Sequence, residues 1–405
     1  MLKASRRGKL SRSLRVVMVT GAYFPEISGA GLQCRSLIRA ASNQKLTFSV
    51  ITTCTDKSLP FRDRVDGIAV YRLHVPRKGV SFATVLSWVP RLAYLSFKEL
   101  ARADIIHLHG LSRKSYFFIT FGRLFKKILL LKMTSLGVDD PAGVKNAGFL
   151  QVWFWKSVDY YLAPSRALAQ SYRSSGFKPE RLFYLCNGVD TIRFHPAESS
   201  QKRALRSSLA LPQDEVLVLF VGHFSQDKRP HLLAEVWSKL ERGGIGLIFL
   251  GSTSSSSFEV SAEVVQAVKQ AAEKKGTPGR LITVERVESI EDYYRACDIF
   301  VLTSVREGMP NALLEAMASG LACVATRLEG ITDMLLEQPG CGVLFDADDK
   351  EALARALEQL AADSSLRKQL GRKARQEVCK NYDLRLTAEK YREFLSRIVD
   401  RQAPF

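Results

Sequence analysis

The sequence predicts an α/β fold with two domains, each built around a parallel sheet. Short apolar runs, which are typical of buried strands, alternate with helical segments along most of the 405 residues. That length suffices for two domains of ordinary size, and a hydrophobic content of 46% allows two substantial cores. The alternation restarts near residue 190, where the charge balance also changes. We expect a disordered basic leader at 1–15, domains at 16–195 and 196–383, and a closing helix at 384–405.

The first half is expected to hold several strands separated by helices and loops. The expected strands are 16–20, 48–53, 67–73, 104–110 and 160–165, with a helix at 32–41. Two long segments, 80–101 and 116–132, contain aromatic and aliphatic residues interleaved with Arg and Lys, and we expect both to be helices. Such helices suit a membrane interface, and core helices with snorkelling basic side chains are the alternative.

The second half repeats the pattern of strands and helices. Strands are expected at 216–221, 245–251, 281–284, 297–302, 321–326 and 340–345, and helices at 231–240, 312–318, 350–361 and 384–399. The stretch 301–325 is the most informative. An apolar run passes through a polar turn into a helix and then into a second apolar run, which is typical of a parallel sheet.

The chemistry of this stretch lies in its turn, Glu307-Gly308-Met309-Pro310-Asn311. Pro310 suits the first helical position, where its missing N–H has no cost. The N–H groups of Gly308, Met309 and Asn311 would then point out of a helix N-terminus. Such a terminus favours phosphate or sugar oxygens.

Two carboxylates flank the start of this expected helix. Glu307 precedes the helix and Glu315 lies inside it. Both could face one cleft at the carboxyl ends of the strands, where open α/β sheets bind ligands. There they could accept hydrogen bonds from the vicinal hydroxyls of a ribose or hexose. The alternative is a capping Glu and a solvated helix Glu.

Two loops in the first half carry further candidates. A strand, a loop with Gly29 and Gly31, and a helix make an arrangement that can face phosphate or sugar, and a plain tight turn fits as well. Asp139 and Asp140 lie in a loop after a strand end, where they could either bind the hydroxyls of a ligand or cap and turn the chain. We do not interpret them as metal ligands, because no second carboxylate cluster supports such a site.

The string from Glu307 to Glu315, with its Gly-Met-Pro-Asn core and trailing small-x-Gly, resembles the E-x7-E signature of retaining glycosyltransferases of family 4 and their GT-B relatives. The segment 186–196 resembles the interdomain linker of the same family, with Cys186 where proline is usual. Weaker matches lie elsewhere in the correct order, so the resemblance covers most of the chain.

The resemblance assigns roles to individual residues of two segments. In the D-x-x-H-x-H pattern of 104–109, His109 is the histidine that approaches the donor sugar, and His107 is expected to face the opposite way and pack. In the loop after the strand 216–221, Lys228 matches a lysine that clamps the donor diphosphate.

Two features of these donor-side loops depart from the family pattern. His223 stands where the family has arginine, and an imidazole does not replace a guanidinium fork on phosphate, so Arg229 is expected to supply the charge. Gly29 and Gly31 stand at the place of a Gly-Gly loop that lies against donor and acceptor, with Ala30 between them.

The resemblance also implies a fold and a reaction. The fold is GT-B, two Rossmann-like domains facing a central cleft, with the closing helix crossing back to the first domain. The reaction moves a hexose, with retention of configuration, from a nucleotide-diphosphate sugar to a lipid-linked or saccharide acceptor, in surface polysaccharide or glycolipid biosynthesis. Catalytic roles fall to His109, Glu307 and Lys228, and acceptor contacts to Asp139 and Asp140. No cofactor or metal is expected.

Charge and cysteine content bear on partners and compartment. Residues 1–190 carry 30 Lys and Arg against 11 Asp and Glu, and residues 191–405 carry 29 against 30. An anionic partner for the first half is expected, either a phospholipid surface, an anionic lipid-linked acceptor or nucleic acid, unless the charge only serves solubility. Seven scattered cysteines without a C-x-x-C pair suggest neither zinc nor disulfides. With no evident signal peptide or membrane span, we expect a cytoplasmic protein, either free or peripheral on the inner face of the membrane.

Other function classes remain open from the sequence. A GT-B-like nucleotide-sugar epimerase or hydrolase would consume the donor without an acceptor. A basic nucleic-acid-binding protein would account for the charge, but no nucleic-acid-binding module is recognisable and the basic residues coincide with apolar helices, so no nucleic-acid partner is expected. A catalytically inactive family member would account for His223.

Overall fold

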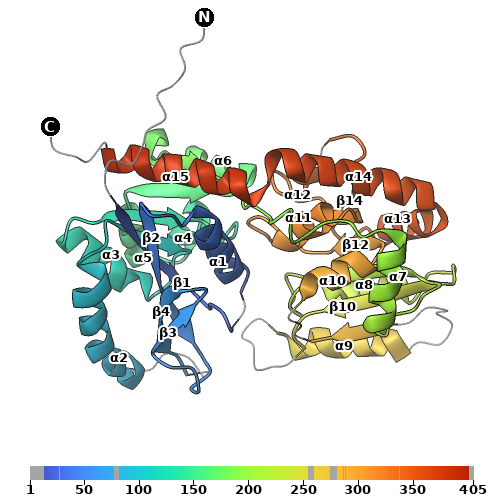
Figure 1. Ribbon diagram of the computed structural model, residues 1–405, viewed down its shortest axis with the longest axis horizontal. Helices are drawn as coiled ribbons and strands as arrows, with labels where there is room; N and C mark the ends of the chain where they lie inside the picture. Colours follow the sequence, from blue (N-terminus) through green and yellow to red (C-terminus); the bar gives the residue numbers. More distant parts are fainter. Residues whose placement is uncertain are drawn as a thin grey trace, which may run out of the picture. The chain divides into compact units, whose positions relative to one another are not determined.

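The structure of the chain is a computed structural model. It describes residues 13–26, 28–76, 82–253, 260–273, 281–285, 287, 289–336 and 338–400. The chain forms two compact units, of which the first combines Met1–Gly188 with Leu384–Phe405 and the second comprises Val189–Asp383 (Figure 1). Each unit has its own sheet covered by helices, so the expected α/β class is confirmed.

The division between the units lies earlier than the expected boundary at residue 195. The segment after Val189 bonds to the second unit: Thr191 Oγ1 donates to the Asp383 carboxylate, and the Arg193 guanidinium lies 2.7 Å from the Glu291 carboxylate. Arg375 donates to the carbonyl of Thr191 at 2.8 Å. These bonds tie the linker to the second unit and not to the first.

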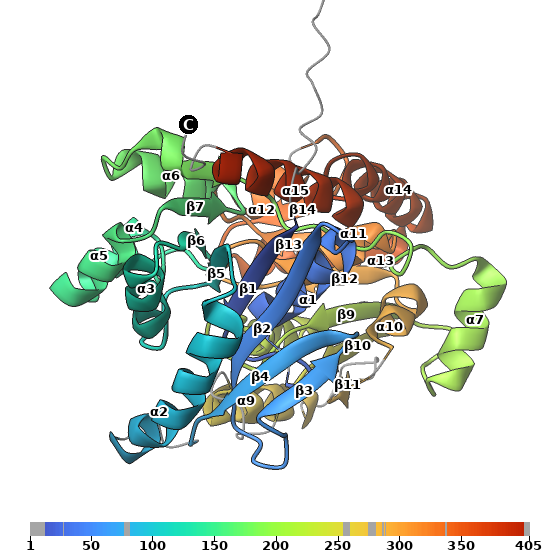
Figure 2. The same ribbon diagram turned by 60° about the vertical axis from the view of Figure 1, so that its left-hand side comes forward.

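The first unit is organised around an eight-stranded sheet of order β3-β4-β2-β1-β5-β6-β7-β8, most of which can be followed in Figure 2. All neighbouring strands are parallel except β3, which runs antiparallel to β4. The strands are β1 (Leu14–Thr20), β2 (Leu46–Cys54), β3 (Arg62–Val65), β4 (Ile68–His74), β5 (Ile105–His109), β6 (Ile128–Lys132), β7 (Tyr160–Ala163) and β8 (Leu182–Tyr184).

Helices cover both faces of the first sheet. They are α1 (Gly29–Ala41), α2 (Phe82–Leu95) continued by the π-helical turn η1 (Ser96–Leu100), α3 (Ser115–Leu124), α4 (Pro141–Asn146), α5 (Phe149–Lys156), α6 (Arg166–Ser174), the 3-10 turn η2 (Pro179–Arg181) and α15 (Leu384–Asp400). Strand β1 shows how the faces are divided: Val17 and Val19 pack toward α2, α3 and α5, whereas Val16 and Met18 pack toward α1 and α15. The two-residue repeat of a strand gives this alternation.

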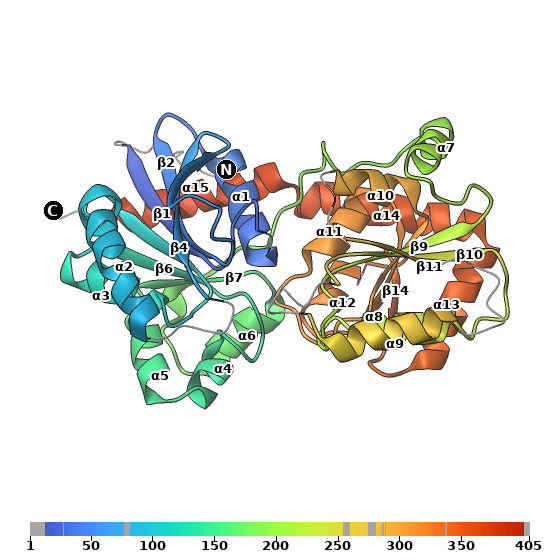
Figure 3. The same ribbon diagram turned by 90° about the horizontal axis from the view of Figure 1, so that it is seen from below.

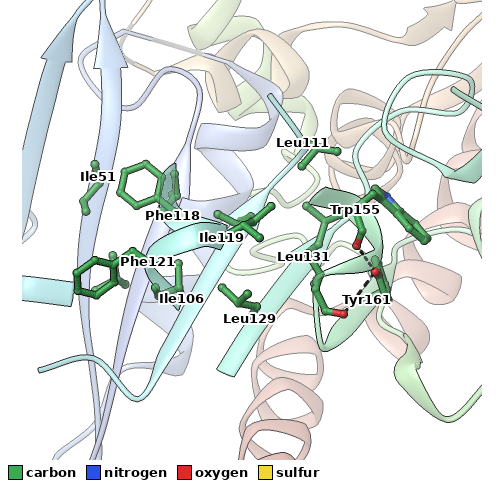
Figure 4. Packing of buried hydrophobic residues seen from close by; sticks show 14 of the residues in the cluster. Ile51, Ile106, Leu111, Phe118, Ile119, Phe121, Leu129, Leu131, Trp155 and Tyr161 are labelled. Carbon is green, nitrogen blue, oxygen red and sulfur yellow. Dashed lines mark hydrogen bonds between the residues drawn. The ribbon is translucent and has the colours of Figure 1, made fainter. Parts of the chain in front are cut away.

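The core beneath α3 and α5 is dominated by large aromatic and aliphatic side chains (Figure 4). Phe118 and Ile119 of α3 are buried against strand residues such as Ile106. Trp155 of α5 stacks on Tyr161 with ring centroids 4.2 Å apart, and the Tyr161 hydroxyl donates to the Trp155 carbonyl. These contacts fix α3 and α5 on the sheet.

The second unit has a fully parallel six-stranded sheet of order β11-β10-β9-β12-β13-β14. The strands are β9 (Val216–Val221), β10 (Ile245–Leu250), β11 (Leu281–Val284), β12 (Ile299–Leu302), β13 (Ala322–Thr326) and β14 (Val343–Phe345). The helices are α7 (Ser199–Ser208), α8 (Pro230–Trp237), α9 (Ala262–Glu273), α10 (Ile290–Ala296), α11 (Asn311–Ala318), α12 (Thr332–Leu336), α13 (Lys350–Ala362) and α14 (Ser364–Asn381). Figure 3 shows α8, α9 and α13 on one side of this sheet and α10 and α11 on the other.

The prediction of one helix over 116–132 is wrong. Helix α3 ends at Leu124, Lys126 has a positive φ of 51°, and Ile128–Lys132 forms the buried strand β6. The apolar run of β6 pairs with β5 on one side and β7 on the other, which satisfies its backbone on both edges. A short apolar run cannot be assigned to helix or strand by its pattern alone.

Two other expectations concern the chain ends and membranes. Residues 1–12 of the expected leader lie outside the described residues, and β1 already begins at Leu14, inside the range assigned to the leader. Among the described residues, no helix has the length and apolar character needed to cross a membrane.

Candidate active site

The strand order of the second sheet reverses between two neighbouring strands, β9 and β12. Strands β10 and β11 follow on one side of this pair, and β13 and β14 on the other. Because all six strands are parallel, the loops that follow β9 and β12 leave from the same edge of the sheet. Open α/β sheets bind ligands at such a switch point, outside the carboxyl ends of the strands.

The two loops bring together Lys228 and Glu307. The Lys228 ammonium lies 2.5 Å from a Glu307 carboxylate oxygen. The Glu307 side chain is 8% exposed and that of Lys228 is 29% exposed. Thr303, just after β12, donates from its hydroxyl to the Lys228 carbonyl at 2.8 Å, which holds one loop on the other. A half-buried ammonium and a carboxylate at one edge can contact a phosphate and a sugar hydroxyl, respectively.

The turn before α11 is buried, and Pro310 caps the helix instead of occupying its first position. Asn311 is its first residue, and Pro310 is the capping residue with φ −76° and ψ 104°. The expectation that Pro310 occupies the first helical position is therefore wrong by one residue. Gly308 is buried and Met309 is 6% exposed, so the turn packs tightly while the helix N-terminus stays at the carboxyl edge. Such a terminus attracts anionic oxygens.

Glu315, in the second turn of α11, is held by a residue that the sequence did not identify. The Tyr294 hydroxyl donates to Glu315 Oε2 at 2.9 Å. Burial raises the pKa of Glu315 to about 7, and the Tyr294 hydrogen bond opposes that rise. Tyr294 is fully buried, which holds its own pKa well above 10, so it remains a donor. This carboxyl therefore titrates near neutral pH, which marks it as a functional candidate.

Arg229 does not join the Lys228–Glu307 pair. It adopts a left-handed backbone conformation with φ 52°, and its guanidinium pairs with the carboxylate of Asp348. Its side chain is 17% exposed, whereas that of Asp348 is 72% exposed. His223 lies in the same loop, half-buried, and its carbonyl accepts from Ser225 N–H at 2.9 Å. The structure thus places both residues after β9, with the charge of Arg229 already engaged.

The first sheet has its own switch point, between β1 and β5. Helix α1 begins at Gly29 in the connection after β1, with Ser28 as its cap. Gly31 is buried one turn later, and a Cβ added there would lie 2.1 Å from the carbonyl oxygen of Ala22. Gly31 is therefore required for the close packing of α1 on the preceding loop. Gly29 is exposed at the helix start, where a ligand can reach its backbone.

His109 closes β5 at this switch point. It is 7% exposed, and among the described residues neither ring nitrogen has a hydrogen-bond partner. Burial, together with the nearby charge of Lys132, holds its pKa well below 6.5, so the ring is neutral. The prediction that His107 faces the opposite way is wrong: the two rings stack with centroids 4.4 Å apart, because residues two apart in a strand share a face.

Lys114, which sequence reasoning missed, reaches the same edge from the loop after β5. Its ammonium donates to the carbonyl of Thr20 at the end of β1 and lies 3.3 Å from the hydroxyl of Thr53 in β2. No ion pair between Lys114 and a described carboxylate is present in the structure. Burial lowers the pKa of Lys114 to about 7. A cation so placed is a candidate for binding an anionic group.

Asp139 and Asp140 both accept hydrogen bonds from the protein itself. Both are 1% exposed. Asp139 accepts from the N–H and hydroxyl of Thr134, at 2.9 and 2.7 Å. Asp140 caps α4 by accepting from Gly143 N–H at 3.0 Å, and it also accepts from the Ser171 hydroxyl. These bonds fit the interpretation of a cap and a turn, and the acceptor role of the two residues stays a prediction. No group of three or more potential metal-ligating side chains occurs in the part of the chain that the structure describes.

Two family models match the chain, one in each half. Residues 201–377 match the model described as "Glycosyl transferases group 1", and residues 28–188 match the "Glycosyl transferase 4-like domain". Together the two matches cover most of the sequence and follow the order that the E-x7-E resemblance predicts.

Several curated proteins are similar in sequence. Sulfoquinovosyl transferase SQD2 of Arabidopsis thaliana is 32% identical over 58% of this chain and 44% of its own length. An uncharacterized glycosyltransferase of Methanocaldococcus jannaschii is 22% identical over 91% and 94%. The lipopolysaccharide core biosynthesis glycosyltransferase LpsE of Rhizobium meliloti is 28% identical over 60% and 66%. The matched region thus spans less than two thirds of two of these three relatives.

Solved structures share the fold. Sucrose-phosphate synthase from Thermosynechococcus elongatus superimposes with a TM-score of 0.79 at 19% identity, covering 96% of this chain and all of that one. HepE of Anabaena, solved in complex with UDP-glucose, has a TM-score of 0.75 at 16% identity and covers 95% and 100%. At these identities the likeness concerns the fold, and it confirms the expected GT-B architecture.

Proposed function

The chain belongs to the group 1 family of glycosyltransferases, and on that premise we propose that it transfers a hexose from a nucleotide-diphosphate sugar to a lipid-linked or saccharide acceptor. The observation that carries this proposal is the Lys228–Glu307 pair, 2.5 Å apart at the switch point of the second sheet. The pair supplies a cation and a carboxylate where the strand ends meet, as recognition of a diphosphate and a sugar requires.

Each residue of the second unit has a distinct part in this proposal. Lys228 and the backbone amides at the start of α11 stabilise the negative charge that builds on the leaving diphosphate. This electrostatic role needs no metal ion. Glu307 holds sugar hydroxyls, and Glu315, oriented by Tyr294, accepts from the ribose hydroxyls. Because Lys228 and Glu307 neutralise each other before the donor binds, binding exchanges their ion pair for a Lys228–diphosphate ion pair and for hydrogen bonds from sugar hydroxyls to Glu307.

We propose that the anomeric configuration is retained. The support is the E-x7-E string from Glu307 to Glu315, which resembles the signature of retaining glycosyltransferases. The neutral ring of His109, with both nitrogens unpartnered, is suited to one hydrogen bond with a sugar hydroxyl. The coupling constant of the anomeric proton in the product, measured by NMR, tests retention.

The acceptor and the location are proposed from the named relatives, the charge and the cysteines. Two relatives are named for sulfoquinovosyl transfer and for lipopolysaccharide core biosynthesis, and the first unit carries the basic excess, so an anionic lipid-linked acceptor fits. All seven cysteines are free, which suits a reducing compartment such as the cytoplasm.

The test is nucleotide release from a panel of UDP-, GDP- and ADP-sugars, with and without a membrane lipid extract. Lys228→Ala should lower release from the active donor at least a hundredfold, because one preorganised charge contact is lost. Lys239→Ala is the matched control. Lys239 also pairs with a glutamate, Glu235, at 2.9 Å, but it lies exposed on the surface just after the C-terminal end of α8. Donor consumption without any acceptor would instead indicate an epimerase or hydrolase, and equal loss in both variants would refute the role of Lys228.

A further inference from the structure

The outer surface of the first unit exposes large apolar side chains on three helical elements that pack on the same face of the sheet. On α2 and η1 these are Leu86, Val89, Tyr94 and Phe97, on and after α3 they are Leu124 and Phe125, and on α5 they are Phe149, Leu150 and Trp153. We call these nine residues the apolar helix surface. Their exposures reach 84% for Phe149 and 82% for Phe97.

Helix α2 and its π-turn are apolar on both sides. Trp88 and Leu95 are buried against the sheet, as expected for a helix in this layer. The opposite side exposes Leu86, Val89 and Phe97, which recur at the spacing of a helical stripe. A surface helix ordinarily shows polar residues on that side, so a second apolar stripe indicates that something covers it.

Helix α5 repeats this feature. Trp155 is 1% exposed and anchors the helix to the core, whereas Phe149 and Trp153, one turn apart, are 84% and 53% exposed. An indole and a phenyl ring held outward on a rigid helix have the amphipathic character of residues that anchor proteins at a lipid interface.

Two contacts tie these elements into one layer. The Lys127 ammonium donates to the Ala101 carbonyl at 2.7 Å, which joins the end of η1 to the end of α3. Tyr116 of α3 stacks on Phe154 of α5 with centroids 4.2 Å apart. The exposed apolar residues therefore belong to adjacent elements and not to scattered sites.

The charge around this surface is one-sided. Residues 82–160 contain eleven Lys and Arg against five Asp and Glu. Each of the five carboxylates accepts a hydrogen bond from the protein itself: Glu99, Asp104, Asp139, Asp140 and Asp159. The basic residues Arg102 and Lys126 are exposed beside Phe97 and Phe125 in the sequence. A partner with an apolar interior and an anionic surface complements this arrangement.

We propose that the apolar helix surface docks on an anionic phospholipid bilayer. Apolar rings enter the interface while Arg and Lys contact the headgroups, which is the pattern of interfacial amphipathic helices. An anionic bilayer complements the basic residues that surround this surface. This inference goes beyond the proposed transfer reaction, because binding to lipid requires neither donor nor acceptor.

The experiment is flotation of the full chain with vesicles of phosphatidylcholine containing phosphatidylglycerol, and with phosphatidylcholine alone. Binding to the anionic vesicles is expected, with loss at high salt. The double variant Phe149→Ser, Trp153→Ser should lower partition at least tenfold, and Arg102→Gln with Lys126→Gln about 25-fold at low salt, at roughly 1 kcal/mol for each basic residue. Ile192→Ser, at a residue of the second unit that is 72% exposed, is the matched control and should bind like the wild type.

Tryptophan fluorescence gives a second readout. Of the four tryptophans, Trp88, Trp155 and Trp237 are at most 7% exposed and Trp153 is 53% exposed. A blue shift of emission on adding anionic vesicles should therefore come from Trp153 and disappear in Trp153→Phe. Circular dichroism and thermal unfolding verify that each variant is folded.

Three outcomes would overturn the proposal. These are no binding by the wild type at millimolar lipid, equal binding to neutral vesicles, or binding unchanged in the surface variants. Sedimentation showing a dimer that the Phe149–Trp153 double variant dissociates, without lipid binding, would assign the surface to a second copy of the chain. Donor turnover is measured separately in detergent-free solution, so failure of lipid binding and failure of the proposed reaction are distinguished.

Discussion

Removal of one hydroxyl, in Tyr294→Phe, should shift the pH dependence of donor binding. The Tyr294 hydroxyl donates to Glu315 at 2.9 Å and favours the ionised carboxylate. A hydrogen bond to a charged group contributes about 1.5–3 kcal/mol, and one pH unit corresponds to 1.36 kcal/mol. The pKa of Glu315 should therefore rise from about 7 by roughly one to two pH units.

The loss of affinity follows from the ionised fraction. If the carboxylate form accepts the ribose hydroxyls, about half of the wild-type protein is competent at pH 7, and about a tenth to a hundredth of the variant. Nucleotide affinity should fall roughly 5- to 50-fold at pH 7 and recover above pH 9. The ring itself stays packed, since it contacts Phe194 at 5.7 Å and Phe300 at 6.0 Å between centroids.

The assay is calorimetric titration of the nucleoside diphosphate whose sugar is consumed, at half-unit steps from pH 6 to pH 9.5. Tyr293→Phe is the matched control, because Tyr293 is the adjacent tyrosine of α10 and no hydrogen bond to Glu315 involves it. Glu315→Gln should flatten the profile altogether. Equal midpoints for wild type and Tyr294→Phe would refute the assignment of Tyr294 as the residue that positions and ionises Glu315.

Further predictions concern stability, both switch points and the metal requirement. Burial in the folded state raises the pKa of Glu315 from its ordinary value of 4.5 to about 7, so the folded protein keeps this proton over that interval. The free energy of unfolding should therefore fall as the pH rises from 4.5 to 7, by up to about 3 kcal/mol. Glu315→Gln should remove this slope, as measured by denaturant titrations at each pH. Lys114→Gln should lower turnover at least tenfold without lowering the melting temperature. Lys127→Gln is the control, because it also loses a bond to a backbone carbonyl and should leave turnover unchanged. Equal turnover in the two variants would contradict the role of Lys114. Asp140→Ala should lower the free energy of unfolding by about 1 kcal/mol through loss of the cap of α4, without raising the KM for the acceptor. Excess EDTA should leave turnover intact, and loss that magnesium restores would show that a metal neutralises the diphosphate.

The sequence identified those parts of the fold and site in which the signal is local. The segment from β12 to β13 is such a case, because its two strands, its turn and its helix are contiguous and its Gly-Met-Pro-Asn turn has few alternatives. Glu307 and Glu315 were found for that reason. The strand β6 was missed because the basic residues before it and its apolar run together imitate an amphipathic helix until Lys126 turns the chain with a positive φ.

Residues whose role depends on a distant partner were predicted less well. The pattern could not decide between a cap and an acceptor site for Asp140, because one of its hydrogen-bond partners, Ser171, comes from α6, 31 residues away. Tyr294 lies 21 residues before Glu315 and belongs to no motif. Burial and pairing of this kind arise from tertiary packing, which sets the energy of a polar group more than its sequence neighbours do.

The switch points explain which candidates lie in functional positions. A residue that follows a strand is easily found in a sequence, but the order of strands decides which loops meet. In the second sheet the order places β9 beside β12, and the pair Lys228–Glu307 forms across 79 residues. In the first sheet β1 lies beside β5, and Lys114 reaches the carbonyl of Thr20 across 94 residues. Sheet topology, and not residue type alone, therefore separates these lysines from the many other basic residues of the chain.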